Sequence, residues 1–193
     1  IADFTEYLPE LLSEVNVLYT PLYDDADLEK ELAKAMQEIR GQRRKGRGFP
    51  TEFHSLRHFI EPQRLIKDSC EISLMQKAAD ITVTAHIEVM RMAKPGVNER
   101  VLEAKMLQHW AEQGTRREAY PSIVASGSNA CTLHYTQNDQ VLKAGDLLLV
   151  DAAAEWQGYA ADVTRTIPVS GRFSKEQAAI YQAVLDCQLA AIA

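Results

Sequence analysis

Residues 147–167 read LLLVDAAAEWQGYAADVTRTI, and this stretch predicts two short β-strands joined by a tight turn at Glu155–Gly158. A turn centred on Trp156–Gln157 would place Asp151 directly opposite Asp162. Directly opposed residues have Cβ atoms roughly 4.5–5.5 Å apart, a distance at which two like charges repel each other. We therefore expect either a cation between these carboxylates or a proton shared by them.

The alternation of side chains along the two strands supports a site on the aspartate face. That face carries small and hydroxyl side chains, namely Ala153, Ala160, Thr164 and Thr166. The other face carries side chains that suit a core: Leu148, Val150, Tyr159, Val163 and Ile167. Hard oxygen ligands favour Mg²⁺, Mn²⁺ or Ca²⁺, and added nitrogen donors would favour Zn²⁺ or Co²⁺. The spacing also allows a second interpretation, in which Asp151 ends a strand, Asp162 is solvated and neither binds anything.

The composition is that of an ordinary soluble globular protein, with 193 residues, 46% hydrophobic and 25% charged. This length suits one large domain, or one domain and part of another. No apolar run approaches the ~20 residues of a membrane span, and acidic residues within the first six positions argue against a signal peptide. We expect a cytoplasmic chain that makes no membrane contact.

Charge and cysteine content narrow the class further. The net charge of −6 argues against a nucleic-acid partner, and the basic run at 40–47 is more typical of a solvated helix end or an exposed loop. Cys70, Cys131 and Cys187 form neither a disulfide framework nor a zinc spacing. We interpret them as buried, inert thiols in a reducing compartment.

Helical spacing of apolar residues predicts four helices along the chain. They are a helix capped by Asp25 or Asp27 and running to about Arg40, then 70–93, 99–113 with Asn98 as its cap, and 174–193. Residues 122–126 are a strand candidate, whereas 56–67, interrupted by Pro62, has the pattern of a bridge between domains. This order predicts an α+β fold with helices on one face of a mainly antiparallel sheet, and domains at 1–66 and 67–193.

Among the histidines, His134 is the candidate functional residue. It follows a glycine-bearing turn at 127–129 and precedes the hairpin with the two aspartates. An imidazole there could hydrogen-bond a substrate carbonyl or move a proton, although it could equally tie down a loop. His86 and His109 lie within predicted helices, where we expect packed or solvated side chains rather than metal ligands.

Two segments resemble a known family. Residues 120–135, YPSIVASGSNACTLHY, are similar to the substrate-side segment of the Xaa-Pro aminopeptidases (aminopeptidase P). Residues 150–166 are similar to the first metal-ligand segment of that family, and the helix ending at 94–96 also fits. The resemblance covers about 65–193, and residues 1–64 match only loosely the end of the amino-terminal domain. It implies the first half of a "pita-bread" metallopeptidase domain.

The resemblance implies a reaction and a role for each candidate residue. Two divalent ions, usually Mn²⁺ with Zn²⁺ or Co²⁺ as alternatives, would share a bridging water or hydroxide. Asp162 would bridge both ions, Asp151 would bind one of them, and Thr164 would orient a carboxylate. His134 would contact the substrate and stabilise the tetrahedral intermediate. The enzyme, which we expect to be a homo-oligomer, would release the first residue of peptides that have proline second.

One departure and three alternatives remain. The family completes its metal site with a histidine and two glutamates from the second half of the domain, and no such segment follows Ala154. We therefore expect this polypeptide alone to bind metal weakly and to be inactive. A prolidase has a very similar hairpin, a creatinase-type enzyme works without metal, and a non-catalytic pita-bread module would bind peptides or proteins. The sequence SIVASGSNAC at 122–131 favours aminopeptidase P over prolidase.

Overall fold

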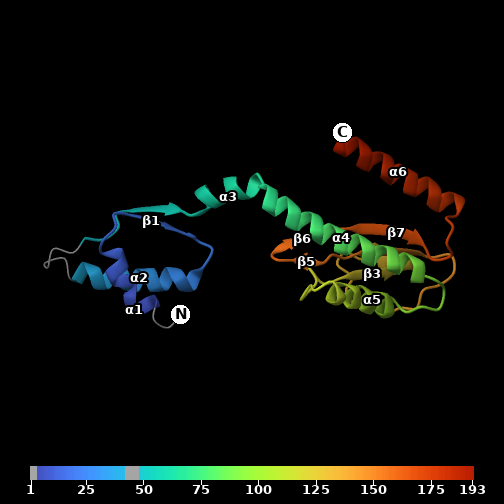
Figure 1. The fold of residues 1–193 in the computed structure, drawn as a ribbon, viewed down its shortest axis with the longest axis horizontal. Helices are drawn as coiled ribbons and strands as arrows, with labels where there is room; N and C mark the ends of the chain where they lie inside the picture. Colours follow the sequence, from blue (N-terminus) through green and yellow to red (C-terminus); the bar gives the residue numbers. More distant parts are fainter. Residues whose placement is uncertain (1–3, 42–47) are drawn as a thin grey trace. The chain divides into compact units, whose positions relative to one another are not determined.

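The computed structural model describes residues 4–41 and 48–193, which form two compact units, Ile1–Lys67 and Asp68–Ala193. The chain order of helices and strands is shown in Figure 1. Most of the basic run at 40–47 lies outside the described residues. The two units are taken in turn below.

The described residues of the first unit form three helices and two parallel strands. These are α1 (Phe4–Leu12), β1 (Val17–Thr20), α2 (Ala26–Gly41), β2 (Glu52–Ser55) and α3 (Arg57–Leu65). The side chain of Asp25 accepts hydrogen bonds from the backbone N–H groups of Asp27 and Leu28, so Asp25 caps α2, one of the two caps expected. A small core joins α1 to α2 through Leu8, Leu12, Ala35 and Ile39.

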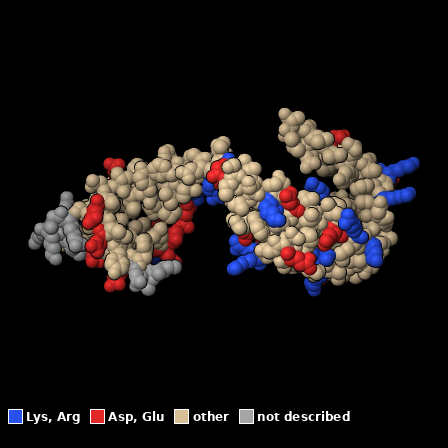
Figure 2. Space-filling model, in the orientation of Figure 1, with Lys and Arg blue, Asp and Glu red and all other residues tan. Residues whose placement is uncertain are grey.

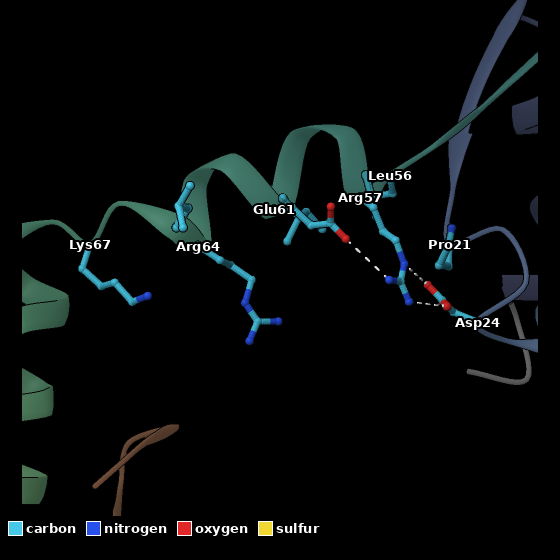
Figure 3. Close-up of a pocket in the computed structure, with 9 residues that line it drawn as sticks. Pro21, Asp24, Leu56, Arg57, Glu61, Arg64 and Lys67 are labelled. Carbon is cyan, nitrogen blue, oxygen red and sulfur yellow. Dashed lines mark hydrogen bonds and ion pairs between the residues drawn. The ribbon is translucent and has the colours of Figure 1, made fainter. Parts of the chain in front are cut away.

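Helix α3 lies within 56–67, the segment predicted to bridge the two domains, where no helix was predicted. It continues through Pro62 and has no buried residue. The interior proline is the sequence feature that argues against this helix, because a proline normally ends or kinks a helix. A hollow of about 600 Å³ lies beside α3. Two arginines, Arg57 and Arg64, line this hollow, and Arg57 is already paired with Asp24 at 2.6 Å and with Glu61 at 3.5 Å (Figure 3).

Two helices open the second unit, as the sequence predicts. Helix α4 (Ser69–Met92) begins with a reciprocal capping box between Asp68 and Glu71, and α5 (Glu99–Glu112) is capped by the Asn98 side chain. Both bury one face against the sheet (Figure 1). The shared core contains Ile81, Ala85, Val89, Leu102, Met106, Trp110, Val124, Leu148 and Val150.

The sheet is antiparallel, with the strand order β3-β4-β7. Its strands are β3 (Ile123–Ser126), β4 (Leu147–Asp151) and β7 (Thr164–Pro168), with β5 (Glu155–Trp156) and β6 (Tyr159–Ala160) forming the hairpin tip. The 3₁₀ helix η2 (Gly127–Cys131) follows β3, and α6 (Lys175–Ile192) ends the chain. The predicted α+β class is confirmed. The helices cover one face of the sheet, and Asp151 lies on the other, beside the small cluster of Ile123, Ala125 and Tyr135.

The predicted register of the hairpin is wrong, because the turn is centred one residue later than predicted. Glu155 pairs with Ala160, and Asp151 pairs with Thr164 rather than with Asp162. The turn is centred on Gln157–Gly158, whose φ values of 49° and 88° match the type I′ hairpin turn, which requires positive φ at both central residues. Moving the centre by one residue moves each partner by two, so every side chain keeps its face.

The surface of the second unit corrects another prediction. Cys70, Cys131 and Cys187 are all free and exposed, not buried, because each lies where its element faces solvent. Figure 2 shows acidic and basic side chains interspersed over the visible face of this unit. Among the described residues, no helix combines the length and the apolar character needed to cross a bilayer.

Candidate active site

A pocket of about 460 Å³ opens on the face of the sheet away from the helices. It is lined by Tyr120, Pro121, Ile123, His134, Thr136, Asp151 and Asp162. Three of the four candidate residues, His134, Asp151 and Asp162, are therefore brought to one hollow although they come from three separate segments. Thr164 does not line this pocket. It is exposed, lies opposite Asp151 in the ladder, and its carbonyl oxygen accepts a hydrogen bond from Arg165.

Tyr120 joins the two aspartates. Its hydroxyl oxygen lies 2.7 Å from Oδ1 of Asp151 and 3.1 Å from Oδ1 of Asp162. A phenol has a single proton to donate, so it cannot satisfy both carboxylates at once. Burial raises the pKa of this hydroxyl well above its usual value, and the two neighbouring carboxylates raise it further. The phenol therefore stays protonated as a donor.

The sequence did not single out Tyr120. It lies three residues before Ile123, the cross-strand partner of Asp151, so its place in the site follows from the pairing of β3 with β4. Strand neighbours are set by tertiary packing, and a single sequence offers no direct signal for this pairing. The only local mark is the Tyr-Pro step just before the strand.

The convergence of two carboxylates on one oxygen fits a divalent cation. Like charges brought together are costly unless a cation or a shared proton separates them, and carboxylate oxygens are ligands that Mn²⁺ and Mg²⁺ accept. Asp151 and Asp162 would be the residues that hold such an ion. Within residues 4–41 and 48–193, no group of three or more His, Cys, Asp and Glu side chains is placed to hold a metal. The described residues thus offer such an ion two carboxylates and no larger cluster.

His134 stands at the rim of the pocket in a strained backbone conformation. Its φ is 52°, in the left-handed region that non-glycine residues seldom occupy. The side chain is exposed and faces the same hollow as the aspartates. Strain of this kind persists only where the surrounding structure enforces it, and it is common at functional sites.

A buried glutamate enforces the conformation of the loop that carries His134. Glu99, fully buried at the start of α5, accepts five hydrogen bonds. The donors are Ser126 N and Oγ (both 2.7 Å), Asn129 Nδ2 (3.3 Å), Tyr135 Oη (2.9 Å) and Gln140 N (3.0 Å). Burial, reinforced by the bond to Glu99, raises the pKa of Tyr135 to about 12. This role could not be predicted from the sequence, because an acidic residue at a helix start normally faces solvent.

The sequence of this chain matches a known protein family. Residues 73–193 match the model of metallopeptidase family M24, which is more than half of the chain. The chain belongs to metallopeptidase family M24. An M24 relative named Xaa-Pro aminopeptidase, from Haemophilus influenzae, is 40% identical over 195 residues. That alignment covers all of this chain but only 42% of the relative, so the chain spans less than half the length of the curated relatives it matches.

Solved structures of aminopeptidase P have the same fold as this chain. Aminopeptidase PepP from Pseudomonas aeruginosa has a TM-score of 0.95 at 42% identity, covering 98% of this chain and 43% of that one. Zinc-substituted aminopeptidase P from Escherichia coli, solved in complex with product, has a TM-score of 0.92 at 34% identity, covering 96% of this chain and 42% of that one. The expected pita-bread architecture, present here in part, is confirmed.

Proposed function

We propose that the protein containing this chain is a metal-dependent Xaa-Pro aminopeptidase, which releases the first residue of peptides with proline in second position. The observation that carries this proposal is the meeting of Asp151 and Asp162 at the hydroxyl of Tyr120, with His134 on the same pocket. The names of the M24 relatives support the substrate class.

The cofactor we propose is a pair of divalent ions, with Mn²⁺ as the first choice and Zn²⁺ or Co²⁺ as alternatives. When bound, such ions lower the pKa of a coordinated water and polarise a carbonyl group. The protein's contribution here is to hold two carboxylates on one side of the site. Tyr120 donates a hydrogen bond to Asp151 and keeps that carboxylate from turning toward solvent. Thr164, the cross-strand partner of Asp151, is the candidate for orienting the carboxylate further.

His134 has the position needed for a group that contacts the substrate. Its exposed imidazole lines the pocket, and His134 is not one of the proposed metal ligands. It can therefore donate a hydrogen bond to a substrate carbonyl oxygen that gains negative charge. The proline requirement follows from the substrate: its tertiary amide has no N–H and its ring fixes φ. General peptidases that bind an extended N–H-bearing backbone would reject such a bond.

Three further parts of the proposal concern the whole protein. The described aspartates supply too few ligands for two ions, so activity requires metal ligands in addition to these two. We also propose a homo-oligomer and a cytoplasmic location. Both rest on the family resemblance and on the sequence composition.

The deciding experiment is a peptidase assay of the full-length protein with Mn²⁺. We expect release of the first residue from an Xaa-Pro-Yaa tripeptide, loss of this activity with a chelator, and its recovery when Mn²⁺ returns. Cleavage of Xaa-Pro dipeptides alone would indicate a prolidase instead. If the protein binds the tripeptide but does not cleave it with any of the divalent metals tested, it is a non-catalytic module, and the proposed enzymatic activity is refuted.

A further inference from the structure

The β-ribbon that carries the aspartates is interrupted at the site. The ladder of β4 with β7 ends at Asp151–Thr164, one further backbone hydrogen bond runs from Ala152 N to the Val163 carbonyl oxygen at 3.2 Å, and pairing of the hairpin tip begins at Glu155–Ala160. Between them, residues 152–154 and 161–163 belong to no named strand. Asp151 is the last ladder residue on one side, and Asp162 lies in the middle of the gap on the other. The gap therefore determines how the two carboxylates approach each other.

Helix α4 binds the gap from the other face of the sheet. The hydroxyl oxygen of Thr82 accepts a hydrogen bond from the backbone N–H of Ala154 at 3.0 Å. Nε2 of His86 lies 2.9 Å from the carbonyl oxygen of Ala152. These are backbone groups that a continuous ladder would have paired across the strands. Because Ala152 and Ala154 are both fully buried, water cannot replace these partners, and leaving the groups unpaired would cost roughly 1–3 kcal/mol each.

The chemistry of His86 indicates that its one hydrogen bond is the reason for its burial. A carbonyl oxygen can only accept, so Nε2 carries the proton and donates it. The other ring nitrogen, Nδ1, is buried without a partner among the described residues. Burial lowers the pKa of this imidazole, which keeps it neutral. An apolar side chain of similar size would avoid the cost of dehydrating Nδ1, but it would leave the Ala152 carbonyl unpaired.

We infer that Thr82 and His86 are positioning residues: by binding the backbone on both sides of Ala153, they hold open the gap that lets Asp162 reach the hydroxyl shared with Asp151. Neither touches the pocket, since both act from the helix-covered face through the backbone. The inference rests on the proposed function only where it concerns metal. Its consequence there is that these two side chains set the metal affinity of a site on the opposite face of the sheet.

The test compares variants of the full-length protein. Thr82→Val keeps the side-chain volume, His86→Phe keeps an aromatic ring that is somewhat larger, and both remove the hydrogen bond. Thr82→Ser retains the hydroxyl, and His86→Gln places an amide N–H near the position of Nε2. Thr84→Val and His109→Phe make the same chemical changes on α4 and α5 away from the ribbon, where Thr84 and His109 bond each other. Mn²⁺ affinity is measured by calorimetry, and order in residues 151–163 by hydrogen–deuterium exchange in chelator.

We expect Thr82→Val and His86→Phe each to weaken Mn²⁺ binding by about 10-fold or more, the range seen when supports of metal ligands are removed. They should also speed exchange in 151–163, whereas the conservative and control variants should resemble wild type. Wild-type affinity and exchange in both Thr82→Val and His86→Phe would overturn the inference, and if His86→Phe does not fold, Thr82→Val decides. A wild-type protein that binds no Mn²⁺ would refute the proposed function instead, and the exchange arm would then decide the inference by itself.

Discussion

Oδ1 of Asp151 lies 2.7 Å from the hydroxyl oxygen of Tyr120, and this contact is the shortest link between the β4 strand and the segment that precedes β3 in the pocket. Substituting Tyr120→Phe should leave two carboxylates facing each other without a donor. We expect the free energy of unfolding in chelator to fall by about 1 kcal/mol and Mn²⁺ affinity to fall about 10-fold. Denaturant unfolding and calorimetry measure the two effects.

Tyr159→Phe is the matched control for that substitution. It removes a hydroxyl that donates to Glu71 at 2.6 Å, on the helix-covered side of the hairpin. It should change stability by a similar amount and leave Mn²⁺ affinity unaltered. Equal losses of Mn²⁺ affinity in both variants would show that Tyr120 has no special relation to the site.

Neutralising one aspartate should separate stability from function. Asp162→Asn removes the repulsion with Asp151, so the metal-free protein should become more stable by several tenths of a kcal/mol, the scale of like-charge pairs in sheets. The same variant should lose the rise in melting temperature that Mn²⁺ produces in wild type. Asp186→Asn, on α6, changes the net charge equally and should do neither. A metal-free Asp162→Asn protein that is less stable than wild type would contradict the prediction.

The isolated 193-residue chain should bind Mn²⁺ weakly. Two carboxylates offer too few of the oxygen ligands that a divalent ion takes, and the described residues contain no larger cluster. Calorimetry should detect no tight binding of two ions. Submicromolar affinity at two sites would mean that the chain holds a complete metal centre.

The hairpin turn can be improved by one substitution and damaged by another. Gln157 has a φ of 49°, and Asn tolerates this region better, so Gln157→Asn should stabilise the protein by a few tenths of a kcal/mol. Gly158 has a φ of 88° and no neighbouring atom within 4 Å of an added Cβ, so Gly158→Ala should cost about 1 kcal/mol through backbone strain alone. Thermal unfolding of both variants checks the two signs, and equal signs would mean a different turn.

Tyr135 should make stability fall at high pH. Its pKa is raised from 10.0 to about 12 in the folded protein, mainly by burial and then by the bond to Glu99. Between these two values the unfolded chain loses the proton before the folded one does, so unfolding releases a proton and becomes easier as pH rises. The contribution is complete below pH 10.0 and is lost as pH passes about 12.

The variant Tyr135→Phe isolates this effect. It should be less stable than wild type at neutral pH by about 1 kcal/mol, because Glu99 loses a donor. The difference between the two proteins should shrink between pH 10.0 and about 12. Tyr23→Phe, at a side chain that is 92% exposed, should show no such trend. A constant difference across this range would exclude Tyr135 as the titrating group.

The sequence predicted those features that local patterns determine. Helices α4 and α5 have apolar stripes and strong caps, so their bounds fell within a residue or so of prediction. The turn was misplaced because the pair Gln157-Gly158, where both residues have positive φ, indicates a type I′ turn less clearly than Asn-Gly would. The prediction of which side chains share a face of the hairpin was nevertheless correct, because a shift of two residues in the cross-strand partners leaves each side chain on its face.

The parts that escaped prediction depend on tertiary contacts. Tyr120 and Glu99 act through partners between 27 and 42 residues away, and the side chains of both are polar groups whose burial no local pattern indicates. His134, Asp151 and Asp162 were named from the sequence, and the fold brings them to one pocket. Their roles in catalysis stay predictions, and Asp162→Asn tests the metal-binding part of one of them.

Cys131 offers an unplanned advantage. Its thiol is exposed at the end of η2, three residues before His134, while the other two cysteines lie on α4 and α6. A maleimide fluorophore attached there, with Cys70 and Cys187 changed to serine, would sit beside the rim of the pocket. Its emission would report in real time on peptides arriving and departing, without any need for turnover. The same accessibility means that purified protein will cross-link in air unless a reductant is present.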